Sequence, residues 1–351
     1  MISPSVQRRA AKFSKTMQLW NASRENIFRL FIRTDSCFAL QMNSPLRRVA
    51  RAVLFVLTLL ADVAFAEVMP PASFAYVLQA DSLAKSQADA VQKLAACERD
   101  WLVLDANFSS PDEPWATNNI SVIRAGKFGR KVIAYLSIGE AEDYRAYWRS
   151  AWRTNPPAFL LAQNPEWKGN YRVKYWRAEW QKIILADVDK IMATGFDGVY
   201  LDIVDGFETF EQDGNNFIDD RVNPETKQSY RRDMVDWVKA VAARARAKNP
   251  TALVIPQNGT QLFAHADFLA VADASGVEDL FTNSDKLQTS AETKYRLETL
   301  APLLAAHKPA LDIEYAKRKE RQTFARESAA QHGLICLVTD RQLKTLGVSG
   351  K

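Results

Sequence analysis

Short apolar runs alternate with longer amphipathic segments along most of this chain. The runs are rich in Val, Ile, Leu and Tyr and are almost continuously hydrophobic. Strands that are covered on both faces have this composition, because neither face meets water. Eight runs are therefore expected to be strands: 74–79, 101–108, 131–139, 198–205, 252–259, 273–281, 309–316 and 334–340.

The segments between these runs carry apolar residues at helical spacing. Helices are expected over 82–97, 178–195 and 227–250, and the second ends at Gly195, a residue that commonly closes a helix. Strands that alternate with helices eight times favour an α/β fold of the (β/α)8 TIM-barrel type over a doubly wound sheet. We expect one such domain over residues 67–351.

The first 66 residues differ in charge from the rest. They hold ten of the 46 Lys and Arg residues and three of the 41 acidic ones, which leaves 36 basic and 38 acidic residues in 67–351. The formal charge of +5 thus belongs to the N-terminal segment. No nucleic-acid partner is expected, because the predicted domain carries no excess of positive charge.

Residues 42–66 have the pattern of a signal peptide. Three arginines precede an apolar run at 52–61, and a small-x-small sequence ends at Ala66. The run is shorter than the ~20 residues that a membrane span needs. We expect cleavage after Ala66, no stable membrane insertion, and a secreted or periplasmic protein; an uncleaved N-terminal anchor is the alternative. Residues 1–41 would then be an over-called or disordered extension.

Cysteine and histidine residues give little sign of a metal site. Cys97 and Cys336 follow the predicted cleavage point, and the sequence leaves open whether they form a disulfide or remain buried thiols. His265, His307 and His332 lie far apart, and no Cys/His spacing typical of zinc occurs. No metal and no cofactor are expected.

Acidic or amide residues follow nearly every predicted strand. Function collects at the C-terminal strand ends of (β/α)8 barrels. Two carboxylates on opposite sides of one bond can cleave a glycoside, since one donates a proton while the other attacks the anomeric carbon or activates water. Helix capping and ion pairing are the alternative explanation. The residues concerned are Asp105, Glu140, Asp202, Asp205, Asn258, Glu278, Asp279, Glu314 and Asp340.

Aromatic residues are concentrated in the largest predicted insertion, residues 140–177, between the third and fourth strands. Sugar rings stack their C–H faces on flat aromatic side chains, so an aromatic wall above paired carboxylates is typical of a glycosidase. We expect Trp115, Trp148 and Trp167 to form such stacking platforms.

Six ordered segments stand out as motifs: YLSIGEAEDYRAYW (135–148), NPEWKGNYRVKYW (164–176), GFDGVYLDIVDGFE (195–208), PQNG (256–259), VEDLF (277–281) and DIEYA (312–316). Together they resemble glycoside hydrolase family 114, the endo-α-1,4-polygalactosaminidase family, over roughly residues 74–346. The resemblance implies a (β/α)8 barrel, similar in layout to α-galactosidase-type barrels. In those barrels the two catalytic acids follow the fourth and sixth strands.

On this resemblance Asp202 is the expected nucleophile and Glu278 the expected general acid/base. Side-chain alternation places Asp202 with Tyr200 and Val204 on one strand face and Asp205 on the other. The residues expected to bind substrate are Asp105, Tyr135, Glu140, Asp205, Asn258 and Glu314, with Trp115, Trp148 and Trp167.

The expected function is an exported, endo-acting and retaining glycoside hydrolase. The resemblance implies an α-linked polysaccharide, containing α-1,4-linked galactosamine, as the substrate. Such a polymer is cationic when deacetylated, and a rim of carboxylates attracts it. The alternatives are a non-catalytic carbohydrate-binding barrel and a hydrolase of a different α-glycoside. A monomer with a polysaccharide or oligosaccharide as its substrate is expected.

Overall fold

Eight parallel strands form a closed ring in this protein. The computed structural model describes residues 70–214 and 216–350; the predicted extension (1–41) and signal peptide (42–66) lie outside the described residues. The strands of the ring are β1 (Phe74–Val77), β2 (Trp101–Leu104), β3 (Lys131–Ser137), β7 (Gly198–Asp202), β10 (Leu253–Pro256), β11 (Ser275–Glu278), β14 (Ala310–Glu314) and β15 (Ile335–Val338).

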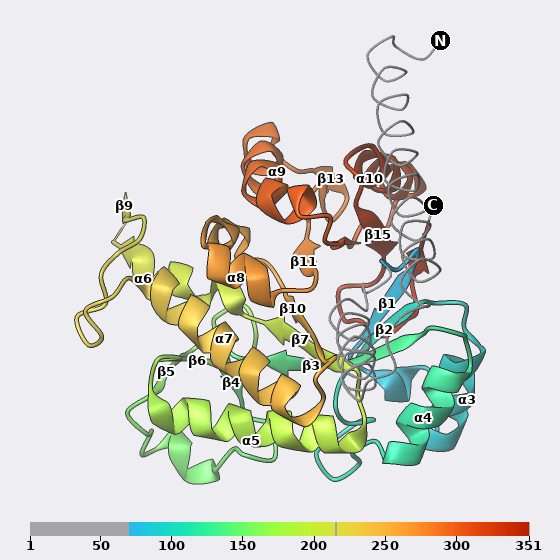
Figure 1. Ribbon diagram of the computed structural model, residues 1–351, viewed down its shortest axis with the longest axis horizontal. Coiled ribbons are helices and arrows are strands. Elements are labelled where there is room, and N and C mark those ends of the chain that lie inside the picture. Colours follow the sequence, from blue (N-terminus) through green and yellow to red (C-terminus); the bar gives the residue numbers. More distant parts are fainter. Residues whose placement is uncertain (1–69, 215, 351) are drawn as a thin grey trace, which may run out of the picture. The chain divides into compact units, whose positions relative to one another are not determined.

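Backbone pairing fixes the order of the ring. One sheet runs β1-β2-β3-β7-β10 and the other begins β11-β14-β15, with parallel pairs throughout these strands. A parallel bridge between Gln257 and Gly276 connects β10 to β11, and β15 contacts β1. The short β16 (Val348–Ser349) pairs antiparallel with β15. The ring is the expected (β/α)8 barrel (Figure 1).

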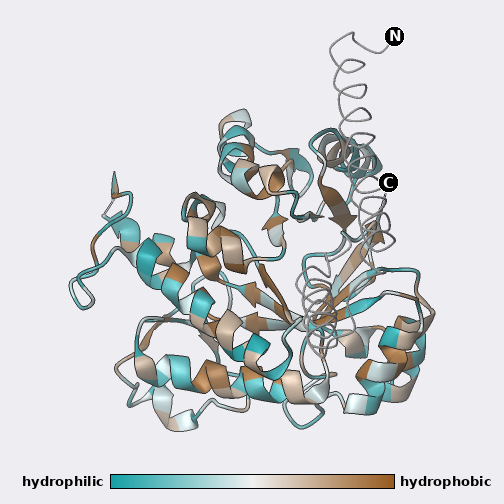
Figure 2. Cartoon of the chain, in the orientation of Figure 1, coloured by the Kyte–Doolittle hydropathy of each residue, from teal (hydrophilic) through white to brown (hydrophobic). Residues whose placement is uncertain are grey.

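Helices cover the outside of the ring. For example, α4 contacts β3, α5 contacts β7, and α10 contacts both β14 and β15. The longer helices are α3 (Gln87–Ala96), α4 (Thr117–Ala125), α5 (Ala178–Thr194), α7 (Tyr230–Lys248), α8 (Ala266–Val271), α9 (Ser290–Ala305) and α10 (Lys319–Gln331). Figure 2 shows hydrophobic residues gathered on the strands of the ring, whereas the helices also carry hydrophilic residues.

Local sequence signals set the helix ends. The first helix begins later than the pattern predicted, because the Ser86 side chain accepts a hydrogen bond from the Asp89 amide and caps α3 there. Gly195 closes α5 as expected, with a φ of 94° that suits glycine. Ser229 caps α7 in the same way as Ser86 caps α3. None of the described helices is long and apolar enough to cross a membrane.

Tyrosine side chains fill the inside of the ring near the C-terminal strand ends. The rings of Tyr76 on β1 and Tyr200 on β7 lie 5.0 Å apart, and these strands are not neighbours in the ring, so the contact crosses its interior. Gly276 makes this possible, because an added Cβ would lie 1.8 Å from the Tyr200 hydroxyl. A second apolar layer, between strands and helices, includes Val132, Ile184 and many other buried side chains.

Short elements on the C-terminal side form the rim of the barrel. After β3 the chain forms a three-stranded sheet, and after β7 and β11 it forms small hairpins. These elements are β4 (Glu140–Glu142), η2 (Ser150–Arg153), β5 (Leu160–Gln163), β6 (Asn170–Val173), η3 (Val204–Phe207), α6 (Glu208–Glu211), β8 (Gln212–Asp213), β9 (Asn216–Phe217), β12 (Thr282–Asn283) and β13 (Lys286–Leu287), with η1 (Ala80–Ser82) after β1 and η4 (Thr260–Ala264) after β10.

The strand predicted over 198–205 ends earlier than expected. Ile203 has a φ of 57°, a left-handed conformation that stops the strand at Asp202 and turns the chain into η3. The predicted alternation therefore does not extend to Val204 and Asp205, which lie in a helical turn rather than on opposite strand faces. Cys97 and Cys336, whose pairing was open, are free thiols.

Candidate active site

The Asp202 carboxylate lies at the end of β7 and has three hydrogen-bond donors. The Tyr135 hydroxyl, from the neighbouring strand β3, donates to Oδ2 over 2.8 Å. The Ile203 amide donates to Oδ1 over 2.8 Å, and Gln257 Nε2 donates to the same oxygen over 2.9 Å. Burial raises the pKa of Asp202 to about 6, although the donors from Tyr135 and Ile203 oppose the shift.

The Glu278 carboxylate lies at the end of β11 and is held in a similar way. The Tyr315 hydroxyl donates to Oε1, while Oε2 accepts from Gln257 Nε2 over 2.9 Å and from Asn258 Nδ2 over 3.4 Å. Asn258 also accepts the backbone N–H of Glu278 over 3.2 Å. Burial and then the charge of Asp202 raise the pKa of Glu278 to about 7, against the effect of the Tyr315 donor.

A single amide nitrogen joins these two carboxylates. Gln257 Nε2 donates one N–H to Asp202 Oδ1 and the other to Glu278 Oε2, both over 2.9 Å. Two bonds of 2.9 Å that share one nitrogen hold the two oxygens no more than about 5.8 Å apart. Carboxylates this close titrate as a pair, and ionisation of one disfavours ionisation of the other.

A second acid cluster beside the pair is neutralised by Arg145. Its guanidinium donates to Asp105 over 2.9 Å and to Glu142 over 2.5 Å, and both acids are largely buried. Glu142 also accepts from the Tyr144 hydroxyl over 2.7 Å. Burial raises the pKa of Asp105, while Arg145 opposes the shift. The structure thus shows Asp105, the predicted substrate ligand after β2, in an ion pair with Arg145.

Asp205 is a third acid near the pair. It lies in η3, and its carboxylate has no ion-pair partner among the described residues. Burial raises the pKa of Asp205 well above its usual value, and the charges of Glu208, Asp202 and Glu278 add to this. The structure thus places the predicted substrate ligand Asp205 where negative charge is uncompensated. Within residues 70–214 and 216–350, no group of three His, Cys, Asp or Glu has a metal-binding arrangement.

The structure does not place two of the predicted substrate ligands at an open surface. Trp115 is only 2% exposed: its ring packs against Phe108 and its Nε1–H donates to the Asp105 carbonyl over 2.9 Å. Glu314 is fully buried on the helix-facing side of β14, where it accepts the amides of Phe281 and Thr282. Both side chains are buried and bonded to neighbouring parts of the chain.

The predicted residues of the insertion divide into buried and exposed ones. Glu140 is buried and accepts hydrogen bonds from Asn164 and Asn170 within the insertion. Trp148 packs against neighbouring aromatic rings there rather than forming the exposed platform that was expected. Trp167 is half exposed at the turn between β5 and β6, where a sugar can reach it.

Sequence reasoning missed three residues of this site. Gln257 and Tyr315 donate to the carboxylate pair, and Glu142 accepts from Arg145. Side-chain alternation along β14 could have pointed to Tyr315. Tyr315 is two residues after Ile313 and so shares its strand face, and Ile313 pairs in register with Glu278. Parity thus distinguishes Tyr315, inside the ring, from Glu314, outside it.

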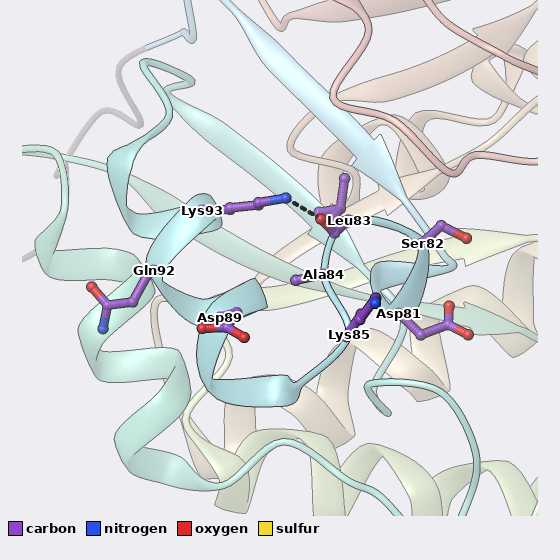
Figure 3. Close-up of a pocket in the computed structure, with 8 residues that line it drawn as sticks. All are labelled: Asp81, Ser82, Leu83, Ala84, Lys85, Asp89, Gln92 and Lys93. Carbon is purple, nitrogen blue, oxygen red and sulfur yellow. Dashed lines mark hydrogen bonds between the residues drawn. The ribbon is translucent and has the colours of Figure 1, made fainter.

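Two hollows lie near the C-terminal strand ends. One, between η1 and α3, is open and does not include the carboxylate pair (Figure 3); it is lined by Asp81, Ser82, Leu83, Ala84, Lys85, Asp89, Gln92 and Lys93. The other, of about 370 Å³, includes Tyr315 and Arg341 in its wall. Because Tyr315 also contacts Glu278, this second hollow adjoins the pair.

This chain is similar to several known proteins. The chain is 37% identical to an uncharacterised protein of Deinococcus radiodurans over 246 residues, which is 70% of this chain and 74% of the relative. It is 39% identical to an uncharacterised protein of Methanocaldococcus jannaschii over 193 residues, or 54% of this chain and 53% of that protein.

Two solved structures share the fold. The glycoside hydrolase domain of PelA from Pseudomonas aeruginosa matches with a TM-score of 0.58 and 20% identity, over 80% of this chain and 98% of that one. Aspergillus fumigatus Ega3, solved in complex with galactosamine, matches with a TM-score of 0.57 and 18% identity, over 82% and 98%. The sequence model of glycoside-hydrolase family GH114 matches residues 60–350, which confirms the resemblance seen in the motifs, and the chain belongs to that family.

Proposed function

We propose that this glycoside hydrolase is a retaining enzyme in which Asp202 is the nucleophile and Glu278 the general acid/base. The observation that carries the proposal is the Gln257 amide that bonds both carboxylates. Retaining enzymes separate their carboxyl groups by ~5–5.5 Å and inverting ones by ~6.5–9.5 Å. The limit of about 5.8 Å between the bonded oxygens favours retention.

The pKa values support this division of roles. Asp202, with a pKa of about 6, is ionised at neutral pH more readily than Glu278, with a pKa of about 7. Glu278 then gives its proton to the glycosidic oxygen while Asp202 bonds to the anomeric carbon and the old C–O bond breaks. In the second step Glu278 takes a proton from the attacking water, and the ester bond to Asp202 breaks.

We infer that the substrate is an α-linked, amino-sugar polymer that is cut internally. Asp202, Asp205 and Glu278 lack ion-pair partners among the described residues, so a cationic sugar beside them would favour the ionised forms of these acids and be held by them. The relative Ega3 was solved with galactosamine. Half-exposed Trp167, at the rim, supplies a stacking surface beyond the unit being cleaved.

We also propose export of the protein. The arginines, apolar run and small-x-small sequence that end at Ala66 support cleavage by a signal peptidase and a secreted or periplasmic, monomeric product. N-terminal sequencing of the protein recovered outside the cytoplasm tests this; an N-terminus far from Glu67 contradicts it.

The activity is tested with α-1,4-linked galactosamine oligomers, free and N-acetylated, together with a panel of other α-glycosides. Mass spectrometry of early products distinguishes internal cuts from release of terminal units. NMR of the first anomer formed distinguishes retention from inversion. We expect internal cuts and a first product in the α configuration; a β product would contradict retention.

The two roles are tested with Asp202→Asn and Glu278→Gln. Both variants are expected to lose at least ~10³-fold in kcat, since each removes a group that acts in the transition state. Matched controls are Asp213→Asn and Glu327→Gln, which alter exposed acids outside the site. Full activity in either site variant overturns its assignment, and binding of glycan without any product in the wild type favours the carbohydrate-binding alternative.

A further inference from the structure

Each carboxylate of the pair has one oxygen that is filled with donors and one that is not. An ionised carboxylate oxygen accepts about two hydrogen bonds. On Asp202, Oδ1 already has two donors, the Ile203 amide and Gln257 Nε2, whereas Oδ2 has only the Tyr135 hydroxyl. One acceptor position therefore remains, and it is on Oδ2.

Glu278 shows the same asymmetry. Its Oε2 accepts from Gln257 Nε2 and from Asn258 Nδ2, whereas Oε1 has only the Tyr315 hydroxyl. When Glu278 is protonated, the proton fits on Oε1, because Oε2 is then the carbonyl oxygen and keeps both of its amide donors. In both acids the filled oxygen is the one that faces Gln257.

We propose that Gln257 is a positioning residue that selects the reacting oxygen of each acid: Oδ2 of Asp202 and Oε1 of Glu278. This inference rests on the proposed function, because it assigns atoms to the two roles named there. Both neighbours of the Gln257 amide are acceptors, so its nitrogen must face them, and its two N–H groups satisfy one oxygen of each acid.

The backbone holds Gln257 between the two strands that carry the acids. Its N–H donates to the Leu201 carbonyl on β7 over 2.8 Å, and the residue bridges in parallel to Gly276 on β11. The side chain is only 3% exposed. A donor fixed in this way holds its geometry while charge moves between the acids.

The bonds change as follows in the first step. A lone pair of Asp202 Oδ2 forms the bond to the anomeric carbon, and the glycosidic C–O bond breaks. The leaving oxygen takes the proton from Glu278 Oε1, which becomes a carboxylate. Asp202 Oδ1 is then the carbonyl oxygen of the ester and keeps its donors from Ile203 and Gln257.

Gln257→Met tests the positioning role, since Met is similar in length and lacks the two N–H donors. Both ionised carboxylates lose a donor, so both pKa values should rise, and the acidic limb of the pH profile of kcat/KM should move to higher pH. A fall in kcat of ~10- to ~100-fold is expected, the range for loss of a hydrogen bond to a charged group. The matched control is Gln261→Met, which removes a similar donor from Glu208 over 2.6 Å on the same rim.

A titration that needs no substrate separates this inference from the proposed function. Carbon-13 NMR of labelled side-chain carboxyls, assigned with the Asp202→Asn and Glu278→Gln variants, measures both pKa values directly. In Gln257→Met both midpoints should rise, and in Gln261→Met neither should move. Unchanged midpoints, or a loss of activity with an unshifted pH profile, overturn the positioning role. A wild type that cleaves no glycan contradicts only the proposed function.

The choice of oxygen is tested by trapping the covalent intermediate. Glu278→Gln, reacted with an activated glycosyl fluoride, should accumulate the ester because the fluoride leaves without a proton donor. A crystal structure should show the sugar bonded to Asp202 Oδ2, with Oδ1 still hydrogen-bonded to Ile203 and Gln257. A bond through Oδ1 overturns the assignment.

Discussion

Replacing Glu278 by Gln is expected to stabilise the folded protein at alkaline pH and to leave its stability in acid unchanged. The glutamine amide has the same shape as the carboxyl group. Its oxygen can face the donors of Gln257 and Asn258, and its NH₂ group can face the Tyr315 hydroxyl, which turns to accept. The variant therefore removes the buried charge and keeps the contacts.

The structure sets the size of this effect. Burial and the charge of Asp202 raise the pKa of Glu278 from 4.5 to about 7, which corresponds to a free energy of up to about 3 kcal/mol. A carboxyl group with a raised pKa in the folded state binds protons there more tightly than in the unfolded state. Stability is thus retained below the unfolded pKa and is lost as the pH rises through about 7.

Urea unfolding of the wild type and Glu278→Gln at ~pH 4, ~pH 6 and ~pH 8 measures the difference. The two proteins should be equally stable at the lowest pH, and the variant should be up to about 3 kcal/mol more stable at the highest. Glu327→Gln, at an exposed position on α10, should follow the wild type throughout. A stability gain that is the same at every pH, or none at ~pH 8, would refute the reasoning, because neither depends on ionisation.

Three other outcomes follow from the same network. The pH profile of kcat/KM should be a narrow bell with apparent pKa values near 6 and 7, since one acid must be ionised and the other protonated. Tyr135→Phe should shift the acidic limb to higher pH and lower kcat by ~10-fold, because Asp202 loses a donor to its charged form. Arg145→Met should cost ~3–5 kcal/mol in urea unfolding, because Asp105 and Glu142 are left buried without a cation; a cost below ~1 kcal/mol would show that water replaces the guanidinium.

The sequence predicted the barrel more reliably than the ends of its strands. Continuous apolar runs marked all eight strands of the ring. Strands that are buried on both faces contain few polar residues, so their apolar runs are not interrupted. The early end of the fourth strand was missed, since Ile203 adopts a left-handed conformation that β-branched residues rarely take. The hairpins of the rim were also missed, because two-residue strands such as β8 and β12 carry no periodicity.

The site was harder to predict because a strand end brings a cluster of polar residues and only some face inward. The acids Glu314 and Glu278 occupy similar places at the ends of their strands, yet register puts Glu278 opposite Ile313, inside the ring, and Glu314 outside. Alternation along the strand separates Glu314 from Ile313 and Tyr315, but only the register with β11 shows which of these faces lies inside the ring. Parity could not have shown that Gln257 bonds both acids, since that contact depends on how the ring closes between β10 and β11.

The distribution of cations around these acids argues that the pair is kept for chemistry rather than for stability. Arg145 is shared by Asp105 and Glu142, and Arg341 pairs with Asp279, the residue next to Glu278. Asp105, Glu142 and Asp279 thus have cations, whereas Glu278 and its partner across Gln257, like the neighbouring Asp205, have no ion-pair partner among the described residues. A cation placed between them would lower both pKa values and remove the proton that the leaving oxygen needs at neutral pH. Neutral donors fix the geometry and leave the proton in place, at the cost in stability that the Glu278→Gln variant is designed to measure.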